Sequence, residues 1–178
     1  VKVLDDFAAA VSWLEGIGET DQLGLYYFSE DDFEGLAACK ADNVPVYIPA
    51  EGMMTAAVLR EMAAAAAKRA GVCCMIDVKP QLYWLELSEE DGIFDAAIAA
   101  YLINPLKDSY TYDGIAQDFL GMTVPSRADW LKKMTLTEAS EKDKESFGHY
   151  LAYSAMIPVQ VYGALKNRLE ETGMDRLF

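Results

Sequence analysis

The chain has 178 residues, of which 52% are apolar and 25% charged, and its formal net charge is −14 at pH 7. This composition is typical of a globular protein, and the length suits one domain whose core needs no disulfide or metal ion to hold it together. The acidity argues against a domain that grips nucleic-acid phosphates by itself, because such domains are usually basic.

The first part of the sequence predicts a strand, a helix and then three strands. Residues 1–4 have the pattern of a short strand, and the segment that follows predicts a helix capped by Asp5 or Asp6 and stopped by Gly16. Short connections join the next three strands, which favours an antiparallel meander. These three strands are expected at residues 23–28, 35–39 and 44–48.

A strand–helix–strand unit is predicted to follow. Residues 55–69 are rich in good helix formers, and residues 72–76 form a short apolar run suited to a buried strand. Because a long helix lies between this strand and the previous one, we expect strand 72–76 to run parallel to a neighbour in the sheet.

The second half of the sequence is predicted to be helical. Residues 137–144 are charged and are expected to form a loop or a helix start, and Pro158 is expected to kink the last helix. The predicted helices cover residues 81–87, 94–103, 112–120, 127–134 and 147–171. The sequence thus predicts a single α/β domain over residues 1–178, with strands first and a helical C-terminal half.

Three cysteines and a single histidine limit the possible sites. The adjacent Cys73 and Cys74 lack the paired Cys-x-x-Cys spacing of a zinc site, and three cysteines do not make a disulfide framework. We interpret them as buried thiols in a reducing cytoplasm. His149 has no second histidine with which to build a typical zinc site or a catalytic triad. No apolar run approaches the roughly 20 residues of a membrane span.

Several segments, in the same order, resemble the 3′–5′ exonuclease domain of bacterial DNA polymerase I, a family A DNA polymerase. The most recognisable is residues 94–105, Phe-Asp-Ala-Ala-Ile-Ala-Ala-Tyr-Leu-Ile-Asn-Pro. The others are residues 112–121, Tyr-Asp-Gly-Ile-Ala-Gln-Asp-Phe-Leu-Gly, the Gly-His-Tyr at 148–150, and the ending at 173–178. The resemblance covers essentially the whole chain and implies a ribonuclease H-like fold, in which helices flank a mixed sheet.

The same resemblance implies a setting for the domain. Since the sequence begins at Val1 without a methionine and stops at Phe178, we interpret it as one domain cut from a longer bacterial, cytoplasmic polymerase. Its expected partner is the polymerase domain of the same parent chain, and its expected contact with DNA is made through the parent enzyme. The isolated domain is expected to be monomeric and to have no membrane contact.

Active members of the family resemble two-metal phosphodiesterases. Four carboxylates hold two divalent ions about 4 Å apart, and these ions activate the attacking water and stabilise the leaving oxygen. The family places an Asp-x-Glu pair on the first strand of the meander and a third acid at the start of the helix after the parallel strand. A fourth acid lies on the last helix, four residues after a tyrosine that orients the water.

Carried onto this chain, the pattern lacks its acids. The strand pair falls on Tyr27 and Ser29, the third acid on Gln81 and the fourth on Ser154, and only the tyrosine is retained, as Tyr150. Neutral side chains supply no charge to a hard divalent cation. We therefore predict a vestigial site with no catalytic residue, no bound metal and no cofactor, in a domain retained as a scaffold. Two divalent metals are expected only if the site is active.

Other acids and apolar residues give further expectations. Glu30, Asp31 and Asp32 are interpreted as solvated charges in a turn, and Asp77 as a helix N-cap. The scaffold's interface is expected within residues 147–178 or at the methionines of the central helix region, which are Met53, Met54 and Met62.

Three alternatives remain open. The first is an active exonuclease with relocated carboxylates: Glu30, Asp32, Asp77 and either Asp91 or Asp95. The second is a free-standing interaction module with a ribonuclease H-like shape. The third is an unrelated acidic α/β domain, which solvent exposure of Tyr101 and Leu102 would favour.

Overall fold

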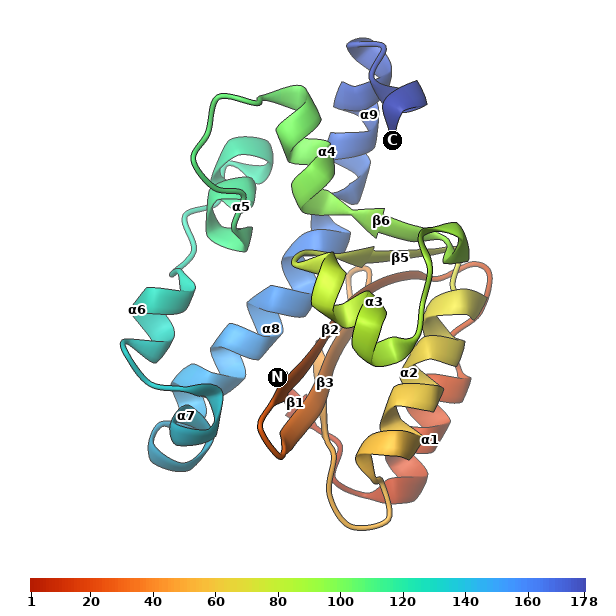
Figure 1. Cartoon of the computed structure of the whole chain (residues 1–178), viewed down its shortest axis with the longest axis vertical. Helices are drawn as coiled ribbons and strands as arrows, with labels where there is room; N and C mark the ends of the chain where they lie inside the picture. Colours follow the sequence, from red (N-terminus) through yellow and green to blue (C-terminus); the bar gives the residue numbers. More distant parts are fainter.

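The computed structural model describes residues 1–178 and consists of one six-stranded sheet with nine α-helices around it (Figure 1). The strands are β1 (Lys2–Val3), β2 (Gln22–Glu30), β3 (Phe33–Lys40), β4 (Val46–Pro49), β5 (Val72–Met75) and β6 (Ile93–Asp95). The helices are α1 (Phe7–Glu15), α2 (Ala56–Arg69), α3 (Val78–Leu85), α4 (Ala96–Ile103), α5 (Tyr112–Leu120), α6 (Arg127–Leu131), α7 (Leu136–Lys142), α8 (Lys144–Gln160) and α9 (Tyr162–Glu171).

The sheet has the strand order β1-β4-β3-β2-β5-β6. Strands β2, β3 and β4 form an antiparallel meander, and β5 lies parallel to β2. The predicted meander and parallel strand are therefore confirmed. Strands β1 and β6 extend the two edges and are parallel to β4 and β5, respectively.

Strand β6 is a correction to the prediction of one helix over residues 94–103. Phe94 is buried in the sheet beside Cys74 of β5, and the helix begins only at Ala96. The Asp95 carboxylate accepts a hydrogen bond from the Ile98 N–H across 3.0 Å and so caps α4. Three residues are too few to show the alternation that identifies a strand.

Two hydrophobic cores lie on opposite faces of the sheet. Figure 1 shows α8 crossing one face and α1, α2 and α3 covering the other. Successive side chains of β2 point alternately to the two cores, because the side-chain period of a strand is two. Tyr26 and Phe28 pack in the α8 core, whereas Leu25 and Tyr27 pack in the α2 core.

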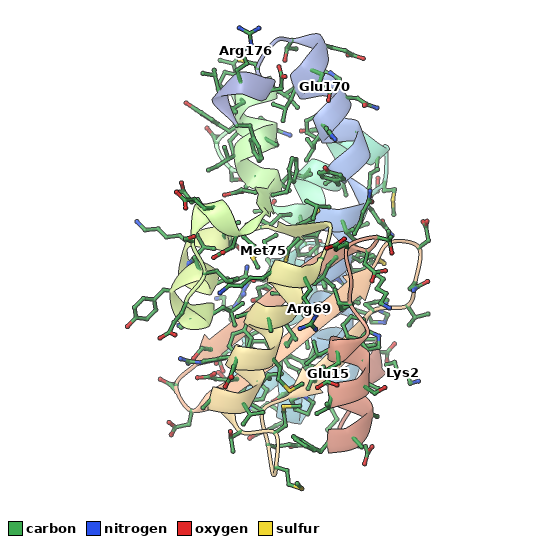
Figure 2. The ribbon with its side chains drawn as sticks, turned by 90° about the vertical axis from the view of Figure 1, so that its right-hand side faces the viewer. Lys2, Glu15, Arg69, Met75, Glu170 and Arg176 are labelled. Carbon is green, nitrogen blue, oxygen red and sulfur yellow. The ribbon has the colours of Figure 1, made fainter.

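Helices α1 and α2 lie side by side on their face of the sheet (Figure 2). Arg69, in the last turn of α2, donates hydrogen bonds to the carbonyl oxygens of Leu14 across 2.7 Å and of Ile17 across 3.1 Å. These bonds tie the end of α2 to the last turn of α1 and to the residues just after it. Asp6 caps the start of the same helix by accepting from the Ala9 N–H.

Helix α8 approaches the central strand more closely than a side chain would permit. A Cβ atom added to Gly24 of β2 would lie 1.9 Å from the Ala155 carbonyl oxygen. Glycine therefore allows the helix backbone to rest directly on the strand.

The structure refines two predictions in the C-terminal half. Of the loop or helix start expected at residues 137–144, it shows a helix, α7, which begins because Thr135 and Glu138 form a capping box. The break in the last helix comes at Val161, not at Pro158, which lies inside α8. Burial of Ile157 and Val159 in the core holds the helix together past the proline. None of the helices is long and apolar enough to cross a membrane.

Candidate functional site

A cavity of about 370 Å³ opens between the sheet and the helices of the α8 core. Tyr26 of β2 and Asp77, just after β5, form one wall, and Tyr150 and Ser154 of α8 form another. The first turns of α5 and α6 complete the cavity, and they contribute Thr111, Tyr112, Asp113, Ser126, Arg127 and Ala128. The cavity thus gathers residues that lie up to 128 positions apart, since Tyr26 and Ser154 both line it.

A chain of hydrogen bonds crosses this cavity. The Tyr26 and Tyr150 hydroxyl oxygens are 2.9 Å apart, and Arg127 Nη1 donates to the Tyr150 hydroxyl oxygen across 2.6 Å. The Arg127 guanidinium carbon also lies 5.0 Å from the centre of the Tyr150 ring, within the range of a cation–π interaction. We call these three residues the tyrosine–arginine cluster.

The charges of this cluster follow from its surroundings. Burial raises the pKa of Tyr26 well above its usual value, and the neighbouring Tyr150 raises that pKa further, so the phenol stays neutral. Burial alone would lower the pKa of Arg127, but Tyr150 and Tyr26 outweigh that effect and raise the pKa. The cluster therefore carries one positive charge, on Arg127.

Two residues predicted for the site lie in this cavity. Tyr150 is at its centre, and Ser154 follows one helical turn later on α8. The Ser154 hydroxyl donates to the Tyr150 carbonyl oxygen across 2.8 Å, so its proton is engaged by the helix backbone.

The predicted strand pair, Tyr27 and Ser29, does not line this cavity. Tyr27 lies on the opposite face of the sheet from Tyr150, in the α2 core. Its hydroxyl and that of Ser29 both donate to the carboxylate of Glu34, the latter across 3.0 Å. Tyr26 faces the cavity instead, because neighbouring residues of a strand point to opposite faces.

Gln81 is buried, with 1% of its surface exposed, and it joins α3 to the sheet. Its side-chain oxygen accepts from the Tyr27 N–H across 3.0 Å, and its nitrogen donates to the Ile76 and Asp77 carbonyl oxygens across 2.7 and 3.2 Å. Both polar atoms of the Gln81 side chain thus make hydrogen bonds to backbone groups. Gln81 also lines a second cavity of about 440 Å³, which shares Tyr26 and Asp77 with the first.

Asp77 does not cap helix α3, contrary to the prediction. It occupies the N-cap position, but its φ of 56° is left-handed and its side chain makes no capping hydrogen bond. An N-cap residue normally has extended backbone, which aims its side chain at the helix N–H groups. Asp77 is instead exposed and lines both cavities. The signal in the sequence was its position directly after a buried strand, where sites often form.

Glu30 is not a solvated turn residue, which corrects a second prediction. It ends β2, and its carboxylate accepts hydrogen bonds from the backbone of Leu136 across 3.2 Å and of Thr137 across 3.1 Å. Burial alone would raise the pKa of Glu30, but these bonds outweigh it and lower the pKa. Asp31 and Asp32 form the exposed turn after it.

Of the carboxylates considered for a relocated metal site, only Asp77 and Asp95 share a cavity, the second one. Glu30 binds the start of α7, Asp91 accepts from the Ser88 N–H across 2.8 Å, and Asp95 caps α4. No group of three His, Cys, Asp or Glu side chains is placed to hold a metal ion. A pair of divalent ions needs several carboxylate ligands, so the residues present do not fit a two-metal centre.

A buried ionic cluster on the α2 face was missed by the sequence analysis. Glu34 of β3 is 9% exposed and accepts hydrogen bonds from Tyr27, Ser29 and both nitrogens of the Arg60 fork, with Nε at 2.9 Å. Burial alone would raise the pKa of Glu34, but the bonds from Arg60, Tyr27 and Ser29 outweigh it and lower the pKa. No local sequence pattern predicts this cluster, because 26 positions separate Glu34 from Arg60.

The cysteines and the histidine lie outside the tyrosine–arginine cluster. All three cysteines are buried, and burial raises the pKa of Cys39 to about 11 and that of Cys74 to about 12, which keeps the thiols protonated and unreactive. His149 stacks on Trp130 with 4.7 Å between the ring centres.

The exposure of Tyr101 and Leu102 in helix α4 bears on the third alternative, because solvent exposure of both residues would favour an unrelated domain. Tyr101 is 50% exposed, whereas Leu102 is partly buried against the α8 core. The third alternative, an unrelated domain, therefore has only part of the exposure that would favour it.

Comparison with known proteins identifies the fold. No family model matches the sequence, and no curated protein is significantly similar to it. Brucella melitensis NrnC has a similar structure, with a TM-score of 0.64 and 12% identity over 90% of this chain and 78% of that one. NrnC with bound Mg²⁺ gives a TM-score of 0.60 and 12% identity over 99% and 83% of the two chains.

A structure described as the apo form of a nuclease has a TM-score of 0.64 and 15% identity over 99% of this chain and 84% of that one. At such low identities the similarity establishes the fold alone. The predicted fold class is confirmed: the chain has a ribonuclease H-like fold, as NrnC has, with a mixed six-stranded sheet flanked by helices.

Proposed function

We propose that this chain is a catalytically inactive 3′–5′ exonuclease-type domain that serves as a structural scaffold. The observation that carries the proposal is the tyrosine–arginine cluster, which occupies the cavity lined by Ser154, one of the positions where the resemblance places a metal-binding carboxylate. Ser154 stands at the acid position of the last helix, Tyr26 lies one residue before the strand position at Tyr27, and Arg127 adds a positive charge beside them. Such a cavity offers only Asp77 and Asp113 as carboxylates, fewer than a pair of hard divalent cations needs.

The parent of this domain is proposed to be a bacterial DNA polymerase I. The support is the resemblance of residues 94–105 and 112–121 to that family, together with the ribonuclease H-like fold. In that setting the polymerase domain of the same chain is the partner, DNA is contacted through the parent enzyme, and the location is the bacterial cytoplasm. The domain itself then needs no metal or other cofactor.

The exposed apolar residues indicate where a scaffold would be contacted. Most of α8 packs in the core, so it is less suited to an interface than the sequence suggested. Met54 is also buried, whereas Met53 is 73% exposed. Leu177 and Phe178, at the C-terminal end, remain exposed beside Ile98 of α4, with which they line a small cavity. We propose this last region as the contact with the polymerase domain.

Hydrolysis of a 3′-end-labelled single-stranded oligonucleotide tests the loss of activity. The purified chain, in excess over DNA and with Mn²⁺, is expected to shorten the substrate no faster than the same mixture with chelator. An active nuclease in parallel reactions shows that the assay works. Chelator-sensitive release of mononucleotides, abolished by Asp77→Asn, would instead support the active alternative with relocated carboxylates.

The scaffold role has a separate test in the full-length polymerase. Deletion of the domain is expected to lower the thermal stability or the processivity of the parent enzyme. If both stay unchanged, the domain is not a scaffold, whatever the outcome of the nuclease assay.

A further inference from the structure

We infer that Arg127 is a built-in cation that keeps divalent metal ions out of the cavity between β2, α6 and α8. The inference rests on the proposed function and names the residue that keeps the cavity free of metal ions. Loss of the acids alone would leave a cavity with Asp77 and Asp113 as its carboxylates, which further carboxylates could reactivate. A fixed positive charge makes the cavity resistant to that change.

The position of Arg127 is set by the start of helix α6. Ser126 and Asp129 form a capping box, with the Ser126 hydroxyl accepting from the Asp129 N–H across 3.2 Å and the Asp129 carboxylate accepting from the Ser126 N–H across 2.9 Å. Arg127 is the first residue inside this helix and points across the cavity to Tyr150. The position of the guanidinium is therefore fixed in two ways: by the capped backbone at the start of α6 and by the hydrogen bond to Tyr150.

The charge on Arg127 has no ion-pair partner. Four ion pairs are present in the structure, and Arg127 takes part in none of them, although the chain carries 29 acidic residues. Its hydrogen bond is made to the hydroxyl of Tyr150, which is bonded in turn to Tyr26. An arginine remains charged at any pH at which the protein is folded.

A metal ion in this cavity would meet that charge at close range. Asp77 and Asp113 are the carboxylates of the lining, and both share the same cavity of about 370 Å³ with Arg127. A divalent cation bound by either would share this cavity with the guanidinium, and like charges repel strongly in a partly buried site. The Tyr26 and Tyr150 hydroxyls are also engaged with each other.

The inference predicts that carboxylates alone do not restore metal binding. The test uses the double variant Tyr26→Asp/Ser154→Asp, which adds two acids on β2 and α8 next to Asp77. Mn²⁺ affinity is measured by calorimetry and by electron paramagnetic resonance, with Arg127 present and with Arg127→Met added. We expect Mn²⁺ to bind at least tenfold more tightly after Arg127→Met.

Two matched variants separate charge from packing. Arg168→Met, in exposed α9, removes the same charge from the protein away from the cavity and is expected to leave Mn²⁺ affinity unchanged. Arg127→Lys keeps the charge and is expected to exclude the ion as the wild-type residue does. Circular dichroism confirms that each variant is folded; if the double variant is not, Tyr26→Asp alone is compared with and without Arg127→Met.

Equal Mn²⁺ affinity with and without Arg127 would overturn the inference, as would an Arg127→Lys variant that binds like Arg127→Met. Failure of this inference can be distinguished from failure of the proposed function. Nuclease activity in the wild-type chain would reject the proposed inactivity, while the Mn²⁺ comparison would still decide the role of Arg127.

Discussion

The side chain of Gln81 joins the central strand to the start of helix α3 through the backbone of Tyr27, whose N–H donates to the Gln81 side-chain oxygen across 3.0 Å. The same side chain donates to the carbonyl of Ile76 across 2.7 Å, at the end of the neighbouring strand. One buried amide thus fixes the turn that presents Asp77, in its left-handed conformation, to both cavities.

Replacement of Gln81 by leucine is expected to lower the free energy of unfolding by about 3 kcal/mol, because a buried N–H and a buried carbonyl lose their partner. Urea denaturation followed by circular dichroism measures the change. Gln160→Leu, at an exposed position of α8, is the control and is expected to change stability by less than about 0.5 kcal/mol. Similar losses in both variants would contradict the role assigned to Gln81.

Glu30→Gln is expected to cost about 1 kcal/mol at pH 7, because a carboxylate that accepts hydrogen bonds from Leu136 and Thr137 becomes a neutral amide. The folded-state pKa of Glu30 lies below its unfolded value of about 4.3, so its contribution is fully present above that pH. It is lost as the pH falls through the folded-state pKa.

The stability difference between wild type and Glu30→Gln should therefore shrink on acidification, which urea titrations from pH 7 down to pH 3 can follow. Asp32→Asn, in the adjacent exposed turn, is the matched control. A difference that stays constant with pH would show that the Glu30 charge contributes nothing to folding.

Glu34 and Arg60 are expected to be energetically coupled. Each of Glu34→Gln and Arg60→Met should cost about 2 kcal/mol, and the double variant should cost less than their sum by at least about 1 kcal/mol, because each change leaves the other partner without its ion pair, Glu34 mostly buried and Arg60 34% exposed. The exposed pair Lys142–Glu138, with its nitrogen and oxygen 3.5 Å apart, provides the comparison. Its coupling should not exceed about 0.5 kcal/mol.

Gly24→Ala tests the contact between β2 and α8. The added methyl group would meet the Ala155 carbonyl oxygen, a backbone atom that cannot move aside without displacing the helix, so a loss of about 3 kcal/mol or a failure to fold is expected. Gly163→Ala, in α9 with no atom within 4 Å of the new methyl group, should be neutral or stabilise by up to about 1 kcal/mol. Thermal melts of the two variants compare them directly, and equal melting temperatures would refute the contact.

Much of the fold was predictable from local patterns. The helix Tyr112–Leu120 ends at Gly121, whose φ of 64° suits glycine, and the helix Ala56–Arg69 begins after Thr55, whose side chain accepts from the Val58 N–H. Turns between β2, β3 and β4 likewise marked the meander. These features are encoded within a few residues, so the sequence reveals them without knowledge of the whole fold.

The register of the site on β2 was not predictable in the same way. The run Leu25-Tyr26-Tyr27-Phe28 is apolar or aromatic throughout, because the strand is covered on both faces. No alternation shows which residues point toward α8. Only the three-dimensional contact of Tyr26 with Tyr150, 124 positions away, distinguishes the two faces.

The contact made by Arg127 was not predictable from the sequence either. Its capping box predicts a helix start, but nothing near it indicates that the guanidinium meets a tyrosine 23 positions later. Contacts between side chains of different helices follow no local pattern, so the sequence could not indicate this one.

The two edges of the sheet are short: β1 has two residues and β6 has three. A long exposed edge offers a row of unpaired backbone groups to which another chain can add a strand, and such additions lead to aggregation. Here little backbone is free at either edge, and copies of a chain with a net charge of −14 repel each other. Concentrated solutions of this protein should therefore resist the growth of intermolecular β-structure, even though the sheet is its central element.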